Sequence, residues 1–279
     1  MRMNNSMNPT AQRSILTVKK KENLTPHYIR ITFTGDDVPL FKDATIGKNN
    51  KIFLPPEGTK EVHFPMVDEA NGDAEEIPEN LKPIRRTYTH RGIDLDKGEM
   101  YVDFIAHGDS GPASAWALRA KPGDPLGIAM KLGTGPLHPP ADWFLFVCDA
   151  TGIPVIASIL EHLPANVKGE AYIEVLNEEE ELPLATEADI SIHWIHNPQP
   201  GEKQVLPEVV RKANIPDHSN TSVFGYVAAE FSSVKAIRYF LRKEVGWPQS
   251  ALYAYSYWKF GKSEDGSVSD RQEEKKSFS

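Results

Sequence analysis

The chain has 279 residues, of which 40% are apolar and 25% are charged, so it is long enough for one large or two medium globular domains. Its single cysteine, Cys148, excludes internal disulfides and cysteine-rich iron-sulfur or zinc sites. The net charge of −8 argues against general nucleic-acid binding, which requires a basic surface. Since no apolar run reaches the length of a signal peptide core or a membrane span, we expect a cytoplasmic protein without stable membrane association.

Short apolar stretches separated by turn residues dominate the chain up to about residue 135. This rhythm predicts antiparallel strands that form a β-barrel. Between them, residues 57–83 are acidic and rich in proline and glycine, which indicates a surface excursion. A helix from Gly111 to Arg119 interrupts the pattern. The predicted strands are residues 15–18, 28–33, 51–54, 87–91, 101–105 and 124–130.

A different pattern begins after Pro139 and Pro140. Residues 143–148 form a continuous apolar run, as a strand buried on both faces requires, and residues 153–163 follow with helical spacing. Strands and helices then alternate, which predicts a parallel sheet wrapped by helices and gives the fold class β-barrel plus α/β. The further strands are expected at 171–176, 191–195, 222–227 and 252–257, and the further helices at 204–212 and 232–245.

These patterns predict two domains and a tail. The first domain is expected at 12–138 and the second at 139–262, with the boundary after the change of pattern. Residues 263–279 hold too few apolar side chains to pack, so we expect them to be disordered.

Residues 85–91 combine β-favouring side chains with three arginines, Arg85, Arg86 and Arg91. A strand cannot bury that many guanidinium groups without an anionic partner. The helix near Ser114 offers unpaired N–H groups, and Gly111 allows close approach of a ligand, so the two segments predict one pyrophosphate site. The alternatives are an exposed edge strand with solvated arginines and a Ser114 that only caps its helix.

Residues 149–154 follow the first strand of the predicted parallel sheet, at the edge where nucleotides bind in such folds. Thr151 is therefore a candidate cofactor-binding residue. The segment is not a G-x-G-x-x-G loop, and the alternative is an ordinary turn between strand and helix.

The R-x-Y-T-x-R pattern of Arg86, Tyr88, Thr89 and Arg91 is similar to the flavin signature of the ferredoxin-reductase superfamily. Its form resembles that of siderophore-interacting proteins, the flavin-dependent ferric-siderophore reductases. The resemblance spans about residues 12–262 in matching order. It continues through residues 103–116, 121–124, 142–145 and 257–261.

The resemblance implies an antiparallel Greek-key flavin-binding barrel followed by a Rossmann-like parallel-sheet nucleotide-binding domain. It implies FAD as cofactor, with Thr89 near the flavin ring and the arginines on phosphate, and NADH, NADPH or ferredoxin as electron donor. Family members often have an arginine where this chain has Asn197, which favours NADH or a protein donor over NADPH. The implied FAD-binding residues are Arg86, Tyr88, Thr89, Arg91, His107, Gly108, Gly111, Ala113 and Ser114.

A bulky anionic ferric siderophore needs positive side chains around an open pocket. The resemblance implies Lys51, Lys131 and Lys259 for this role; the alternative for each is a solvated surface charge. Arg85 and His90 are expected to be ordinary surface residues, and Trp258 to cover the flavin or to pack at the sheet edge. Iron would be a passing substrate, so we expect no permanent protein-metal site.

The leading hypothesis is cytoplasmic reduction of ferric siderophores through FAD by a monomeric enzyme without a catalytic acid, base or nucleophile. One alternative is a general NAD(P)H flavin or ferredoxin-type reductase. A dedicated substrate site formed by the three lysines would distinguish a ferric-siderophore reductase from such an enzyme. The other is a siderophore-binding protein without turnover, which would carry no flavin.

Overall fold

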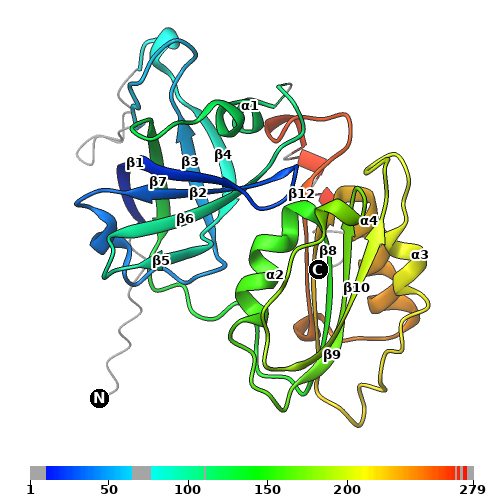
Figure 1. Ribbon diagram of the computed structural model, residues 1–279. Coiled ribbons are helices and arrows are strands. Elements are labelled where there is room, and N and C mark those ends of the chain that lie inside the picture. Colours follow the sequence, from blue (N-terminus) through cyan, green and yellow to red (C-terminus); the bar gives the residue numbers. More distant parts are fainter. Residues whose placement is uncertain (1–10, 65–76, 110, 268, 271–272, 275–279) are drawn as a thin grey trace, which may run out of the picture. The chain divides into compact units, whose positions relative to one another are not determined.

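A computed structural model describes residues 11–64, 77–109, 111–267, 269–270 and 273–274 (Figure 1). The chain separates into two compact units, with the division between Pro136 and Leu137. Of the acidic excursion expected at 57–83, residues 65–76 lie outside the described residues. None of the helices in the described ranges is long and apolar enough to cross a membrane.

The first unit is built on a seven-stranded sheet in the order β4-β3-β7-β1-β2-β6-β5, with every pairing antiparallel. β4 and β6 are not neighbours in this order, yet the rings of Tyr88 and Phe104 lie 4.5 Å apart and the Arg91 N–H donates to the Tyr101 carbonyl at 3.1 Å. The sheet is therefore curled into a half-barrel, which confirms the expected fold class. Its strands are β1 Ala11–Asn23, β2 Tyr28–Thr34, β3 Asn49–Leu54, β4 Ile84–Thr89, β5 Gly92–Asp94, β6 Glu99–Ile105 and β7 Pro125–Lys131.

Alternate residues of these strands fill the half-barrel, because successive side chains of a strand point to opposite faces. Leu16, Ile31 and Phe104, for example, are completely buried in one apolar core. Helix α1, Pro112–Arg119, packs on this core through Trp116, whose ring lies 5.7 Å from that of Phe104. The small Ala113 and Ala117 are buried beside it and allow the helix to approach closely.

The second unit holds a five-stranded parallel sheet in the order β10-β9-β8-β11-β12. This order reverses between β8 and β11, as in doubly wound folds. Figure 1 shows α2 on one side of the sheet and α3 and α4 on the other. The strands are β8 Trp143–Asp149, β9 Lys168–Val175, β10 Asp189–His196, β11 Val223–Glu230 and β12 Leu252–Trp258. The helices are α2 Ile153–Leu160, α3 Leu206–Val210 and α4 Phe231–Tyr239, which continues into a π-helical turn, Phe240–Glu244.

Strand β8 is buried on both faces, as its continuous apolar run predicts. Leu145 and Val147 belong to the core that α3 and α4 cover. Phe144, Phe146 and Cys148 alternate with them and point to the other face, where the two phenylalanine rings stack at 5.4 Å. Burial, with the nearby charges of Asp149 and Glu174, raises the pKa of the Cys148 thiol well above its usual value.

The prediction of disorder for residues 263–279 rests on their low apolar content. Of this range the structure describes 263–267, 269–270 and 273–274, which include a short 3-10 helix, Asp265–Ser267. Asp270 pairs with Lys259 and Lys262, and Glu274 pairs with the buried Arg238 of α4. Ion pairs join Asp270 and Glu274 to the second unit, and the apolar content of a segment does not reflect such contacts.

Candidate cofactor and substrate site

Strand β4 carries most of the predicted flavin signature. The expected strand at 87–91 is displaced to Ile84–Thr89, because the chain leaves β3 at His90, whose N–H donates to the Lys48 carbonyl, and Arg91 then bonds to β6. Arg86 is half-buried, and its Nη1 donates to the Arg85 carbonyl at 2.7 Å. Thr89 is buried on the opposite face of the strand from Tyr88.

Arg91 lies just beyond the strand and is held by a buried carboxylate. Its Nε is 3.6 Å from Oδ2 of Asp103, which is 3% exposed. Arg30 donates to both oxygens of Asp103, at 2.7 and 2.8 Å, and the Tyr28 hydroxyl donates to Oδ2 at 2.9 Å. This network holds the Arg91 side chain beside Asp103.

The loop before α1 is fastened to the helix by Ser114. Its Oγ accepts the His107 N–H at 2.9 Å and donates to the Gly108 carbonyl at 2.7 Å, and the side chain is 1% exposed. Gly111 lies against the His107 ring: a Cβ there would lie 2.4 Å from His107 Cε1. Gly108 has a φ of +84°, a left-handed conformation that favours glycine.

These residues fit the phosphates of a dinucleotide such as FAD. No side chain caps the first turn of α1, whose N–H groups attract anions. The Tyr88, Phe104 and Trp116 rings join β4 to α1 through contacts of 4.5 and 5.7 Å, so the structure brings both predicted segments to one part of the first unit. Arg86 and Arg91 supply the positive charge. Which of these residues contact FAD stays a prediction.

The expectation that His90 is a surface residue is wrong, whereas Arg85 is exposed as predicted. His90 is completely buried, and among the described residues neither of its ring nitrogens has a hydrogen-bond partner. Burial lowers its pKa to about 4, so the ring is neutral at pH 7. The corner at residues 90–91 turns this side chain inward, and strand alternation alone could not predict that.

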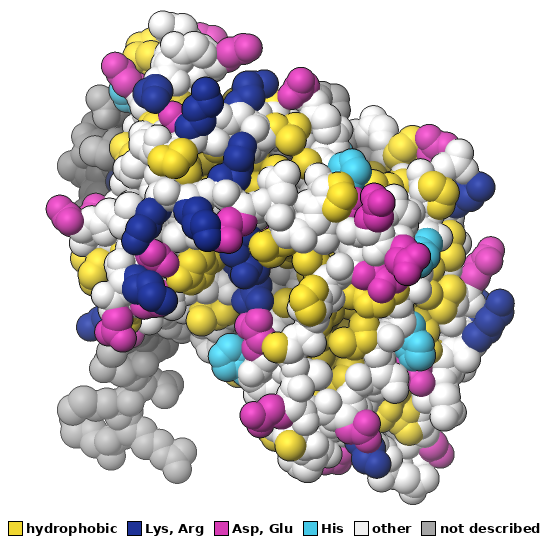
Figure 2. Space-filling model, viewed as in Figure 1, with side chains coloured by type: hydrophobic (Ala, Val, Ile, Leu, Met, Phe, Trp, Pro, Cys, Tyr) yellow, Lys and Arg dark blue, Asp and Glu magenta, His cyan; other side chains and the backbone are white. Residues whose placement is uncertain are grey.

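Lys51 and Lys131 lie on one face of the first sheet. Lys51 is opposite Ala129 of β7, and Lys131 is two residues further along the same strand. Diagonal neighbours of this kind are within reach of long side chains. The Lys51 ammonium donates to the Thr87 hydroxyl, and Lys131 is exposed. Figure 2 shows Lys and Arg side chains gathered on the visible face of the first unit.

Lys259 belongs to the second unit, and its convergence with the other two lysines stays a prediction. Its Nζ lies 2.8 Å from Oδ2 of Asp270 and 4.4 Å from the centre of the Phe231 ring. Trp258, beside it, donates from Nε1 to Oδ2 of Asp149 at 2.7 Å.

Three carboxylates lie at the carboxyl edge of the parallel sheet, the edge at which doubly wound folds bind ligands. Asp149 and Glu230 end β8 and β11, on either side of the reversal in strand order, and Glu174 lies on β9. All three are buried. Thr151 donates to Oδ1 of Asp149 from its N–H at 2.9 Å and from its hydroxyl at 2.5 Å. A role for Thr151 in cofactor binding stays a prediction.

Burial and mutual repulsion change the acidity of this cluster. Burial and the Asp149 charge raise the pKa of Glu174 to about 7, and burial raises the pKa of Asp149. Neither Glu174 nor Asp103 was predicted as a site residue from the sequence. The available signal was a carboxylate within an otherwise apolar strand segment, which is costly unless it has partners.

In the described ranges, no group of three or more His, Cys, Asp or Glu side chains could hold a metal ion. His193 and His196 of β10 have separate contacts: the His193 ring stacks on Tyr172 at 4.7 Å, and His196 lies 2.8 Å from Glu181.

Models of known protein families match both units of the chain. A model described as the siderophore-interacting FAD-binding domain matches residues 17–133, and one described as siderophore-interacting protein matches residues 141–261. Ferric vibriobactin reductase ViuB of Vibrio cholerae is 31% identical over 257 residues, which cover 92% of this chain and 93% of that protein.

Solved structures agree with this grouping. A siderophore utilization protein from T. fusca superposes with a TM-score of 0.81 at 27% identity, over 92% of this chain and 96% of that one. A ferredoxin NADP+ reductase from Neisseria gonorrhoeae, solved with FAD and NADP, has a TM-score of 0.60 at 13% identity, over 89% of this chain and all of that one. At that identity the second likeness shows the fold alone.

Proposed function

Because this chain belongs to the siderophore-interacting protein family, we propose that it is a cytoplasmic FAD-dependent reductase of ferric siderophores. One observation carries the proposal: in the unit matched by the FAD-binding model, Tyr88, Phe104 and Trp116 join the arginine-bearing β4 to the uncapped start of α1. This arrangement suits an anionic cofactor that also needs aromatic neighbours.

When bound, FAD would accept two electrons together and pass them on singly, as ferric iron requires. The chain's own contribution is binding and orientation. Arg86 and Arg91 would neutralise phosphate charge, with Asp103 holding Arg91 in place. Thr89 would lie near the flavin ring, and Ser114 would keep the His107–Gly108 loop on α1. Iron is the substrate and would leave as Fe(II), which siderophore oxygen ligands bind less tightly.

For the electron donor we favour NADH over NADPH, with ferredoxin as the alternative. Asn197 occupies the position where an arginine could hold a 2′-phosphate. It is 1% exposed, its amide donates to the Lys203 carbonyl at 3.1 Å, and its Oδ1 accepts the Gln199 N–H at 3.0 Å. A buried amide used in this way offers no charge to a phosphate.

The proposal is tested by adding FAD to the purified protein and to R86A and R85A. We expect R86A to bind FAD about tenfold or more weakly, because it loses a charge-assisted contact with phosphate. R85A, which removes an adjacent exposed arginine, should bind FAD normally. Full FAD affinity in R86A would contradict the predicted site.

The reaction itself is tested by anaerobic mixing of the FAD-loaded protein with NADH, NADPH or reduced ferredoxin, and then with ferric siderophores. The flavin absorbance should bleach with a donor and return when a ferric siderophore is added. A flavin that is never reoxidised by a ferric siderophore would favour a general flavin reductase. A protein unable to take up FAD would favour a siderophore-binding protein without turnover.

A further inference from the structure

The carboxylate of Asp270 is held by two lysines that lie at the turn after β12. Lys259 Nζ is 2.8 Å and Lys262 Nζ is 2.7 Å from the same oxygen, Oδ2. The two ammonium groups lower the pKa of Asp270 to about 2, so it is ionised throughout the physiological range. Gly261, with a φ of +72°, forms the tight turn that brings Lys262 back beside Lys259.

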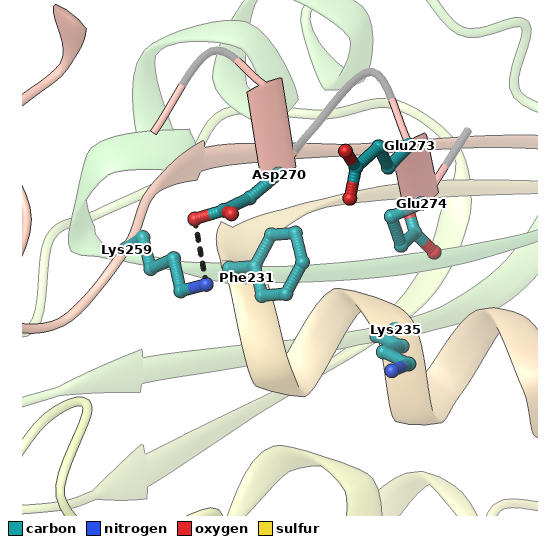
Figure 3. A pocket seen from close by; sticks show the side chains of 6 residues that line it. All are labelled: Phe231, Lys235, Lys259, Asp270, Glu273 and Glu274. Atoms are coloured by element: carbon teal, nitrogen blue, oxygen red, sulfur yellow. Dashed lines mark hydrogen bonds and ion pairs between the residues drawn. The ribbon is translucent and has the colours of Figure 1, made fainter. Parts of the chain in front are cut away.

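Asp270 closes one side of a cavity of about 270 Å³ (Figure 3). Phe231 and Lys235 come from α4, and the Lys259 ammonium lies over the Phe231 ring at 4.4 Å. Glu273 and Glu274 line the side that Figure 3 shows above the helix. An aromatic floor with ammonium groups around it is suited to a flat, anionic ring such as a catecholate.

The tail brings negative charge to this cavity. Its lining contains two lysines, Lys235 of α4 and Lys259, which directly follows β12. The three carboxylates, Asp270, Glu273 and Glu274, all come from the tail. Asp270 is paired with Lys259 and Lys262, and Glu274 with Arg238, so the tail's carboxylates neutralise positive charge that an anionic ligand would otherwise meet.

We propose that Lys259 and Lys262 form an anion subsite for the ferric siderophore, and that the chain's own Asp270 occupies this subsite until the substrate displaces it. The inference rests on the proposed function and adds two residues to it, Lys262 as a substrate contact and Asp270 as an internal competitor. Multiply charged anionic siderophores displace Asp270 more readily than neutral ones, so the tail contributes to substrate selection.

The test measures binding without electron transfer, using the redox-inert gallium(III) complexes of an anionic tris-catecholate siderophore and of a neutral tris-hydroxamate siderophore. Their dissociation constants are measured by calorimetry on the full-length FAD-loaded protein and on D270N. Loss of a solvent-accessible competing ion pair should tighten binding of the anionic complex about two- to fivefold. The gain should shrink with added salt, and binding of the neutral complex should not change.

Two further variants show whether Asp270 acts through the lysines. In K259Q/K262Q the D270N substitution should have no further effect. The control is D189N, which removes an exposed aspartate of the same unit that is 3.9 Å from Lys168, and it should behave as the unmodified protein. An unchanged dissociation constant in D270N, equal tightening toward both complexes, or an effect that survives K259Q/K262Q would overturn the proposal.

Failure of the proposed function gives a different result. In that case the unmodified protein binds neither gallium complex, and ferric siderophores do not reoxidise its flavin; the tail proposal then fails with it. If the unmodified protein binds and reacts but D270N is indistinguishable from it, only the competitor role of Asp270 is refuted.

Discussion

Asp103 joins three positive or polar side chains of the half-barrel at one buried point. It accepts from Tyr28 and Arg30 and lies near Arg91, one of the predicted FAD-binding residues. A buried carboxylate is stable only when its partners remain, and the same holds for the arginines around it. Asp103 is therefore a positioning residue, and its effect on cofactor binding would pass through Arg91.

The substitution D103N removes the charge while keeping the size of the side chain. We expect it to lower the free energy of unfolding by about 3 kcal/mol, because two guanidinium groups lose their buried counter-charge. The affinity for FAD should fall as well. The loss of stability should be measurable by urea unfolding of the protein without FAD. The control is D94N, which breaks an ion pair with Lys97 at the sheet edge and should change stability little. Equal effects of the two substitutions would contradict this role of Asp103.

At the level of the elements, the ends of β8, β9 and β11 concentrate negative charge at the carboxyl edge of the second sheet. Asp149 is stabilised by donors from Thr151 and Trp258, and Glu230 accepts the N–H groups of Ser232 and Ser233 that begin α4. Glu174 has the least favourable surroundings: its Oε2 is buried without a hydrogen-bond partner among the described residues.

The raised pKa of Glu174 makes stability depend on pH. Its pKa is about 7 in the folded protein against 4.5 for an ordinary glutamate, so the folded state holds a proton that the unfolded chain releases. The resulting stabilisation is fully present below about pH 4.5 and is lost as the pH rises to about 7. Asp149 adds a change of the same sign, because its pKa is also raised.

In E174Q this loss should largely disappear, so the variant gains stability relative to the unmodified protein as the pH rises from 4.5 to 8. The measurement is the urea unfolding free energy across that range. E208Q, which removes an exposed carboxylate on α3, serves as the control and should keep the original pH dependence. Parallel curves for E174Q and the unmodified protein would show that Glu174 is not the titrating group.

Periodicity predicted the elements well where local pattern decides the structure. The apolar run at 143–148 predicted β8 to within one residue, and the start of α1 follows from Gly111 and Pro112. The strand expected at 15–18 is the much longer β1, Ala11–Asn23. The three-residue β5 was not predicted, because a strand that short carries no period. The corner at His90 was missed because it depends on long-range bonds to Lys48 and Tyr101.

At the scale of the whole molecule, the predicted substrate lysines are divided between two units. Lys51 and Lys131 share a face of the first sheet, and Lys259 follows β12 of the second. A net charge of −8 would give the proposed anionic substrate no general attraction, so local positive groups would have to attract it.

This division allows a test of whether the units share one substrate. We expect K51E/K131E and K259E each to raise KM for an anionic ferric siderophore about tenfold, and the triple variant to show coupling between them. Reduction of a neutral acceptor by NADH should be spared. K97E, a charge reversal at the turn between β5 and β6, is the control. An effect confined to the variants of one unit, or equal losses with both acceptors, would argue against a common anionic substrate.

Local sequence signals could indicate residue types for the candidate site but not the contacts that complete it. The R-x-Y-T-x-R pattern located Arg86, Tyr88, Thr89 and Arg91, and the turn before α1 located Ser114. The partners Asp103 and Asp270 lie 12 and 11 residues from the groups they hold, Arg91 and Lys259. Asp103 begins the matched segment 103–116, but that segment does not indicate its pairing with Arg91, and Asp270 lies outside every matched segment. Such pairings depend on how distant segments fold against each other, which no short pattern contains.

The burial of Cys148 has a practical consequence for following this protein in solution. The only thiol of the chain is inaccessible, and its raised pKa keeps it from forming the reactive thiolate at neutral pH. We therefore expect the natural chain to react little with thiol-specific labelling reagents. A cysteine introduced at an exposed position of each unit would carry a fluorophore or spin label without first removing a native one. Distances between two such labels would then show whether the separation of the two units changes when a ligand is added.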